Sequence, residues 1–149
     1  TQKMIDLYGW QEAREPFERT YREFSNLDDR YENGIHDLMK FIKFGYGRCS
    51  DHASKDIRTG YLSREEGIER VLKYDHVVSK DLYYWLEYVD MKENEFWEIA
   101  DTFRDPRVWS IKKNIWVKTD IDGKEREYGN VHLNNEQIKS FNNKLKDFT

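Results

Sequence analysis

Apolar side chains recur every three or four positions along much of the chain, which is the spacing of a helix with one buried face. The clearest run begins at Asn33, which can cap a helix whose apolar face consists of Ile35, Leu38, Met39 and Ile42. Before this run, Pro16 suits the first turn of another helix. The apolar positions of that earlier helix would be Phe17, Tyr21 and Phe24.

Further helices are predicted from capping residues that precede apolar side chains at the same spacing. Ser50 or Asp51 can cap a short helix that stops at Gly60. Ser63 and Glu66 match a capping box, in which each side chain accepts a hydrogen bond from the other residue's N–H group. The helix behind this box would bury Ile68, Val71 and Leu72.

Three more helices are predicted towards the C-terminus. Ser79 can cap the first, with an apolar face of Leu82, Trp85, Leu86 and Val89. Asp105-Pro106 would end the second, which carries Phe96, Ile99, Ala100 and Phe103. Asn135 can cap the last, with Ile138, Phe141, Leu145 and Phe148 at heptad-like spacing.

The apolar period shortens towards two after residue 108, as is typical of strands. Asp122-Gly123 follows, and this dipeptide is a strong signal for a tight hairpin turn. We therefore expect one small β-hairpin across about 114–128. The predicted fold is mainly α, a compact multi-helix domain of about five to seven helices with this single hairpin.

Composition narrows the function classes. A length of 149 residues fits a single domain, and 25 basic against 29 acidic side chains give a net charge of −4, which argues against a nucleic-acid binder. Trp, Tyr and Phe make up 15% of the chain and supply the material for a core. No apolar run reaches the length of about 18 residues needed for a membrane span, and no signal peptide is evident. The single Cys49 suits the cytosol, so a cytoplasmic location is expected.

Standard catalytic signatures are absent from the sequence, and no metal site is predicted. The four histidines, His36, His52, His76 and His132, lie far apart and lack metal-ligand spacing. Most of them are expected to be structural or to lie on the surface. His52 is the exception, because it falls within an unusually polar stretch.

This stretch runs from Lys43 to Arg58. Gly45, Tyr46 and Gly47 form a loop in which backbone can approach a ligand, and Lys43 and Arg48 flank it, so a phosphate could bind at the N-terminus of the following helix. Asp51 and Arg58 lie two turns apart and could face the same side as His52 and Lys55. The plainer interpretation is a glycine that ends a helix, an aspartate cap and a solvated charged face.

Two other features have structural explanations that we favour. Cys49 follows Arg48 and lies three residues before His52, as a reactive thiolate would, but a lone cysteine is more often a small space-filling residue. Aromatic residues in two of the predicted helices could stack on a base or sugar, but core packing or a partner interface accounts for them better. They are Tyr83, Tyr84, Trp85, Phe96 and Trp97.

Several motifs, in the same order, give the chain a resemblance over about residues 5–133 to the N-acetyl sugar amidotransferase family of bacterial surface-polysaccharide (lipopolysaccharide O-antigen) biosynthesis. The central ones are Lys43-Phe44-Gly45-Tyr46-Gly47-Arg48, Ser50-Asp51-His52-Ala53, Asp56-Ile57-Arg58 and Ser63-Arg64-Glu65-Glu66. Others are Gly9-Trp10, Glu15-Pro16-Phe17, Asn33-Gly34-Ile35-His36-Asp37, Lys73-Tyr74-Asp75, Glu95-Phe96-Trp97 and Thr102-Phe103-Arg104-Asp105-Pro106-Arg107. The chain resembles the C-terminal half of such enzymes. Position 49 is usually a small residue in the family, so Cys49 departs from its pattern.

The resemblance implies a reaction and a set of partners. Family members resemble PP-loop ATP pyrophosphatases: an N-terminal domain with an S-G-G-x-D-S loop binds ATP with Mg²⁺ and adenylates the N-acetyl oxygen of a nucleotide-linked sugar. Ammonia from a glutaminase and a synthase-like subunit then displaces AMP and leaves an acetamidino group. This chain has no S-G-G-x-D-S loop and begins with Thr1. We therefore expect it to be a single helical domain over 1–149 that belongs to a longer enzyme, binds no cofactor alone and is inactive alone.

The resemblance singles out the positions of the polar stretch, and the charge changes of this reaction suggest a role for each. Lys43, Arg48 and Arg58 would stabilise phosphate charge, Asp51 or Asp56 would face the amidinium that forms, and His52 would accept a proton from ammonia. Gly45, Tyr46 and Gly47 would contact the substrate or its phosphates. The main alternative is a helical interaction module that docks the ammonia-supplying subunits and provides no catalytic group. An unrelated helical regulator or nucleic-acid binder is a weaker alternative, and self-association through exposed aromatic residues is expected.

Overall fold

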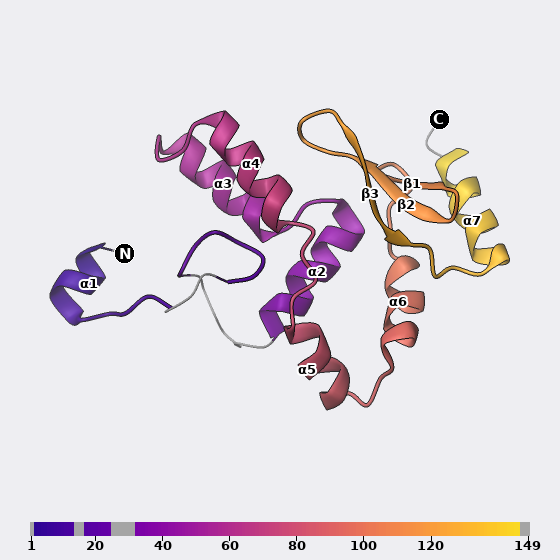
Figure 1. Cartoon of the computed structure of the whole chain (residues 1–149), viewed down its shortest axis with the longest axis horizontal. Helices are drawn as coiled ribbons and strands as arrows, with labels where there is room; N and C mark the ends of the chain where they lie inside the picture. The colour runs from indigo at the N-terminus through magenta and orange to yellow at the C-terminus, as the bar shows by residue number, and fades with distance from the viewer. Residues whose placement is uncertain (1, 14–16, 25–31, 147–149) are drawn as a thin grey trace.

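The computed structural model describes residues 2–13, 17–24 and 32–146, and these residues contain seven helices and one small antiparallel sheet (Figure 1). The helices are α1 (Gln2–Tyr8), α2 (Glu32–Phe44), α3 (Arg48–Arg58), α4 (Arg64–Tyr74), α5 (Asp81–Tyr88), α6 (Glu93–Asp101) and α7 (Asn135–Lys146). The strands are β1 (Trp109–Lys112), β2 (Ile115–Thr119) and β3 (Glu125–Asn130). The prediction of a mainly α fold is confirmed.

Helix α2 is the centre of the molecule and contributes to two separate apolar cores (Figure 1). The predicted face of α2, with Ile35, Leu38 and Ile42, packs against buried residues of α5 and α6. Phe41 points elsewhere and joins the second core, which the sheet and α7 complete. That second core consists of Phe41, Trp109, Trp116, Val131, Leu133 and Phe141.

The sheet has the order β1-β2-β3, with both pairs antiparallel. The predicted hairpin is confirmed as β2–β3, and Gly123 takes the positive φ of +79° that its turn requires. Strand β1 adds a second hairpin that the sequence analysis did not assign. Its turn is Lys113-Asn114, where both residues also have positive φ. A three-stranded sheet that packs on a helix is stable where an isolated hairpin is marginal.

The helix predicted from Phe17, Tyr21 and Phe24 is wrong. Residues 17–24 form turns and bends, while Pro16 lies outside the described residues. The side chains of this segment explain the difference, because Arg19 and Thr20 are buried and pair with groups on other elements. Tertiary hydrogen bonds therefore outweigh the local helical spacing.

The predicted start of four helices is wrong by one to a few residues. Asn33 lies inside α2, Ser50 and Asp51 lie inside the first turn of α3, and Lys80 replaces Ser79 as the cap residue of α5. Asn134 caps α7 in place of Asn135, because its Oδ1 accepts from Gln137 N at 2.9 Å. The capping box of Ser63 and Glu66 is confirmed, with hydrogen bonds of 3.2 and 2.8 Å.

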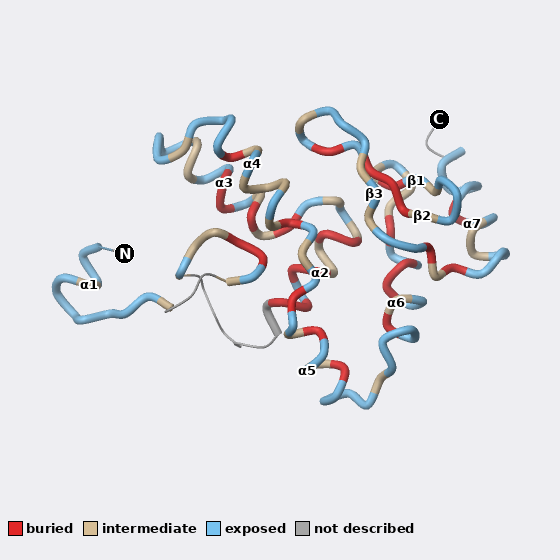
Figure 2. The backbone as a smooth tube through the Cα atoms, viewed as in Figure 1, coloured by how far each residue is buried: buried red, intermediate tan, exposed pale blue. Residues whose placement is uncertain are grey.

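Some predicted apolar faces are only partly covered. Phe96 and Ala100 are buried in α6, but Ile99 is exposed, and so is Phe103, which lies beyond the end of that helix. On α5 and α7, Val89 and Leu145 are likewise exposed, and Phe148 lies outside the described residues. Helix α1 buries no residue and lies apart from the other helices (Figure 2).

Candidate functional site

A cavity of about 130 Å³ lies between the loop that joins α2 to α3, helix α4 and the β2–β3 hairpin. Segments that are distant in sequence therefore meet here. Aromatic, aliphatic and charged side chains share its lining, which consists of Phe41, Gly45, Tyr46, Ser50, Val71, Leu72, Asp75, His76, Lys118, Asp120, Ile121 and Tyr128.

Asp75 is the carboxylate at the helical side of the cavity, directly after α4. Its Oδ2 accepts from Gly47 N at 2.8 Å and from Ser50 Oγ at 2.6 Å, while its Oδ1 accepts from Ser50 N at 3.1 Å. These N–H groups, at the start of α3, are those that a phosphate would use. The anion at this helix N-terminus is thus a side chain of the protein, and the phosphate position expected from the glycine loop is already filled.

Lys118 and Asp120 form the charged part of the hairpin side. The Lys118 ammonium pairs with Asp120 and lies 5.9 and 5.7 Å from the ring centroids of Phe41 and Tyr128. Asp120 also accepts from the Tyr128 hydroxyl and from Arg126 Nη1, the latter at 3.0 Å. Burial and the hydrogen bond to Asp120 raise the pKa of Tyr128 above its ordinary value, so its hydroxyl stays protonated.

Gly45 allows the α2–α3 loop to approach the hairpin closely. Its φ of +74° lies in the left-handed region, and a Cβ there would lie 2.5 Å from Val108 Cγ1 and 2.8 Å from Lys118 Cδ. From the sequence, this glycine was predicted to admit a ligand. The structure instead shows strand β2 at this place, although Gly45 still lines the cavity.

The predicted cations and Asp51 do not gather at one site, because each contacts a different partner outside the cavity. Arg48 pairs with the buried carboxylate of Asp37, and Asp51 pairs with Lys40. Lys43 Nζ lies 4.9 Å from the centroid of the Phe103 ring. Arg58, which is exposed, donates to the carbonyl oxygen of Ser54 at 3.1 Å. None of these side chains lines the cavity.

His52 and Asp56 face the segment 17–24 and not the cavity. His52 Nδ1 shares a 2.7 Å hydrogen bond with Thr20 Oγ1, and Asp56 accepts from the side chains of Tyr21 and Arg22. Burial, reinforced by nearby positive charge, lowers the pKa of His52 to about 4. His52 therefore points away from the solvated side on which Asp51, Lys55 and Arg58 lie.

Arg19 was missed by the sequence analysis, because it lies in the segment that was predicted as a helix. It is 3% exposed, and its guanidinium donates to the carbonyl oxygens of Asp37, Asp75 and Val77. Desolvation by burial, partly offset by the nearby Asp37 and Asp75 carboxylates, lowers the pKa of Arg19 to about 10, so it remains a cation. Arg19 therefore fixes the backbone beside Asp75.

Cys49 has the structural role that the sequence analysis favoured. It is fully buried, and burial raises the pKa of its thiol to about 12, so it is not a thiolate at neutral pH.

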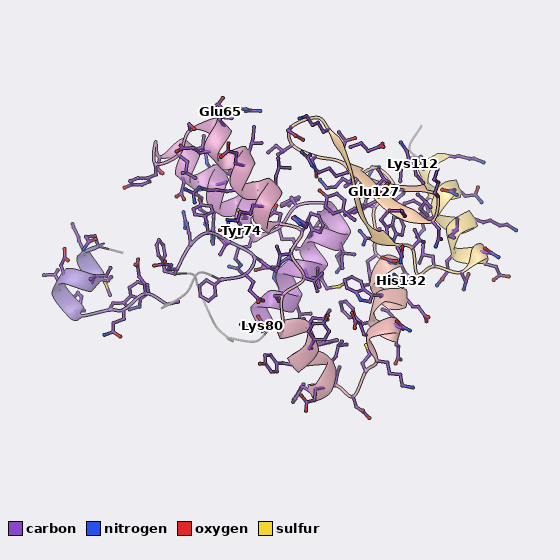
Figure 3. All side chains as sticks on the ribbon, in the orientation of Figure 1. Glu65, Tyr74, Lys80, Lys112, Glu127 and His132 are labelled. Carbon is purple, nitrogen blue, oxygen red and sulfur yellow. The ribbon has the colours of Figure 1, made fainter. Side chains whose placement is uncertain are left out.

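The histidines hold no metal cluster within the described residues, where no three His, Cys, Asp or Glu side chains gather suitably. His132, labelled in Figure 3, stacks on Trp97 with ring centroids 6.0 Å apart. Its Nδ1 lies 3.2 Å from the buried Asp101. Only His76 among the four lines the cavity.

Over the same described residues, no helix has the length and apolarity to span a membrane.

Comparison with known proteins gives one family. A family model described as "LPS biosynthesis protein WbpG-like, C-terminal domain" matches residues 18–121, which is more than half of the chain. The matched segment contains every residue that lines the cavity except Tyr128. No curated protein matches the chain.

Proposed function

Because the chain belongs to the family of WbpG-like C-terminal domains of LPS biosynthesis proteins, we propose that it is the C-terminal domain of an ATP-dependent amidotransferase. This enzyme converts the N-acetyl group of a nucleotide-linked sugar into an acetamidino group. The family establishes a role in LPS biosynthesis, and the reaction comes from the resemblance to the N-acetyl sugar amidotransferases.

The observation that carries the proposal is the convergence of separate motifs on one cavity. Gly45 and Tyr46 come from the first motif, Ser50 from the second and Asp75 from a third, and all four line the cavity. Motifs that are distant in sequence usually meet where a ligand binds or where a fold needs support. The solvent-exposed Tyr46 and His76 in the lining favour ligand binding.

ATP does not fit this cavity. The N–H groups of Gly47 and Ser50 already donate to Asp75, so these groups at the start of α3 do not remain for phosphate oxygens. We therefore assign ATP and its Mg²⁺ to a separate N-terminal domain of the longer enzyme. The resemblance likewise assigns the supply of ammonia to glutaminase and synthase-like subunits.

The two carboxylates have a place in the reaction. An acetamido group is neutral, whereas the acetamidino product and the species before it carry positive charge. A site that presents Asp75 and Asp120 interacts more strongly with the cationic state than with the neutral reactant. These residues take over the role expected for Asp51 and Asp56, because Asp75 and Asp120 line the cavity and the other two carboxylates do not.

Proton transfer from the attacking ammonia is assigned to His76. This residue is exposed at the cavity, whereas His52 is buried against Thr20. An accessible imidazole is the usual acceptor for such a proton near neutral pH.

The test uses the intact enzyme with ATP, an ammonium salt and a nucleotide-linked N-acetyl sugar. We expect sugar-dependent release of AMP and a product in which one oxygen is replaced by NH, as detected by mass spectrometry. His76→Gln should lower turnover about a hundredfold, while the exposed His36→Gln on α2 serves as the matched control. AMP release that does not depend on the sugar, or a sugar that returns unmodified, contradicts the proposal.

The docking module is a second candidate function, and the surface of α5 favours it. Tyr83, Tyr84 and Tyr88 are exposed there, and Tyr88 is 87% accessible. For a docking module, Tyr88→Ala would weaken association with the ammonia-supplying subunits, while His76→Gln would leave turnover with free ammonia unchanged.

A further inference from the structure

We propose that two copies of this chain associate side by side in opposite directions, so that the tyrosine face of α5 in each copy lies against α7 of the other. The tyrosine face consists of Tyr83, Tyr84, Tyr88, Glu87 and Asp90, all of which are exposed. Exposed aromatic surface and opposite charges at the two ends of the molecule support this dimer. It does not depend on the proposed reaction.

The tyrosine face presents a large aromatic surface to solvent. Leu82 and Leu86 are the buried residues of α5, whereas Tyr83 and Tyr84 are each 54% exposed and Tyr88 is 87% exposed. At about 200 Å² per side chain, the three tyrosines expose about 400 Å². A standard interface buries about 800 Å² on each partner, and tyrosine is enriched in interface cores. The tyrosines would thus supply about half of one side of such an interface.

Carboxylates flank these tyrosines. Glu87 lies one helical turn after Tyr83, on the same side of α5, and Asp90 follows the end of the helix. Residues 81–101, which span α5 and α6, contain seven acidic side chains and one basic side chain. Charge complementarity therefore calls for a basic surface opposite the tyrosine face.

Helix α7 of the same chain offers such a basic surface. Lys139, Lys144 and the apolar Leu145 are exposed on it. Residues 109–146, which comprise the sheet and α7, contain eight basic and five acidic side chains. Lysine side chains pair with carboxylates through the ammonium group and pack their aliphatic stems on aromatic rings. A second copy of the chain therefore fits the tyrosine face in both charge and apolar character.

The two surfaces lie at opposite ends of the molecule. Figure 1 shows α5 at the lower edge and α7 at the upper right, with α6 and the sheet between them. One copy cannot bring its own α5 and α7 together. Two copies in opposite directions place α5 of each beside α7 of the other, so the same contact forms twice. This arrangement has two-fold symmetry and closes at the dimer.

The first experiment is analytical ultracentrifugation of the full chain over a range of concentrations. At about 0.05 M NaCl we expect a species of twice the chain mass, and at about 0.5 M NaCl we expect monomers, because salt screens the charges. Tyr88→Ala should weaken dimerisation about tenfold or more. Tyr61→Ala, at a tyrosine between α3 and α4 that is 82% exposed, is the matched control and should have no effect.

Charge reversal then identifies the two surfaces. Glu87→Lys with Asp90→Lys makes the tyrosine face basic, and Lys139→Glu with Lys144→Glu makes α7 acidic. Each double variant alone should be monomeric at low salt, because like charges then meet at both contacts. An equal mixture of the two should dimerise, because both contacts again join opposite charges. Recovery in the mixture also shows that neither variant is merely misfolded.

Three results would overturn the dimer. The first is a wild-type chain that stays monomeric at low salt at every concentration up to its solubility limit. The second is a dimer that either charge reversal leaves intact, and the third is a mixture that does not recover association. If the chain is monomeric and Tyr88→Ala instead releases the ammonia-supplying subunits from the intact enzyme, the tyrosine face belongs to those subunits and not to a second copy.

Discussion

Replacement of Gly45 by alanine tests whether this loop is tightly packed against the sheet. The matched control is Gly60→Ala, because both glycines have positive φ, of +74° and +77°. A Cβ at Gly45 would lie 2.5 Å from Val108 Cγ1 and 2.8 Å from Lys118 Cδ, whereas a Cβ at Gly60 would meet nothing within 4 Å. The pair therefore separates the cost of the backbone conformation from the cost of crowding.

The magnitudes follow from these two geometries. A non-glycine residue in the left-handed region lowers the free energy of unfolding by about 1–2 kcal/mol. Alanine also restricts the unfolded chain more than glycine does, and this offsets about 0.4–1 kcal/mol of that loss. Gly60→Ala should thus lower the free energy of unfolding by about 1 kcal/mol. Crowding against a packed core adds about 1–3 kcal/mol, so Gly45→Ala should lower it by about 2–4 kcal/mol.

Urea unfolding of the wild type and the two variants, followed by circular dichroism and tryptophan fluorescence, measures both values. The variants should differ by more than 1 kcal/mol at the same slope, on the estimate above. Equal losses in the two variants would refute the close approach of the α2–α3 loop to strand β2. The proximity of the aromatic and charged side chains across the cavity would then need an explanation other than this close approach.

Three further predictions concern single side chains. Because burial holds the pKa of His52 near 4, below its ordinary value of 6.5, the unfolded chain takes up this proton first as the pH falls. Stability should then drop by up to about 3 kcal/mol between pH 6.5 and 4, and His52→Gln, measured by urea unfolding, should lack this part of the pH dependence. Ser63→Ala should cost about 1 kcal/mol through loss of the capping box, whereas thermal melts of the exposed Ser54→Ala should match the wild type. Cys49 should react with a disulfide reagent only as fast as the chain unfolds, and labelling within the mixing time would contradict its burial.

The elements with local signals were predictable from the sequence. The hairpin turn needs a residue with positive φ, and Asp122-Gly123 supplies it within two positions. The capping box of α4 likewise involves only Ser63 and Glu66, which are three residues apart. The apolar face of α2 was also correct, because its period is set by the helix itself.

Features that depend on distant residues were not predictable. The start of α3 receives its carboxylate from Asp75, so no capping side chain within its own first turn marks the boundary. Segment 17–24 has helical spacing but forms turns and bends, because Arg19 and Thr20 hydrogen-bond to groups on other elements. In both cases a hydrogen bond between residues far apart in sequence determines the local structure, and the local sequence preference does not.

The candidate site shows the same limit. Gly45 and Tyr46, which were predicted as site residues from their polar, glycine-rich loop, line the cavity. Lys118 and Asp120 were missed, because they lie in a strand and a turn that read as an ordinary hairpin. The tertiary fold brings these two residues opposite α4, and no feature of the sequence around them predicts this position.

The carboxylate of Asp75 has a consequence for how the helical pair α3–α4 opens. At one end the two helices are joined by the turn around Gly60, and at the other Asp75 fastens the end of α4 to the start of α3. A pair closed at both ends cannot fray progressively from a loose end. Its amide protons should therefore exchange with solvent together, as one cooperative unit, and the cavity wall that the pair forms should be lost in a single step.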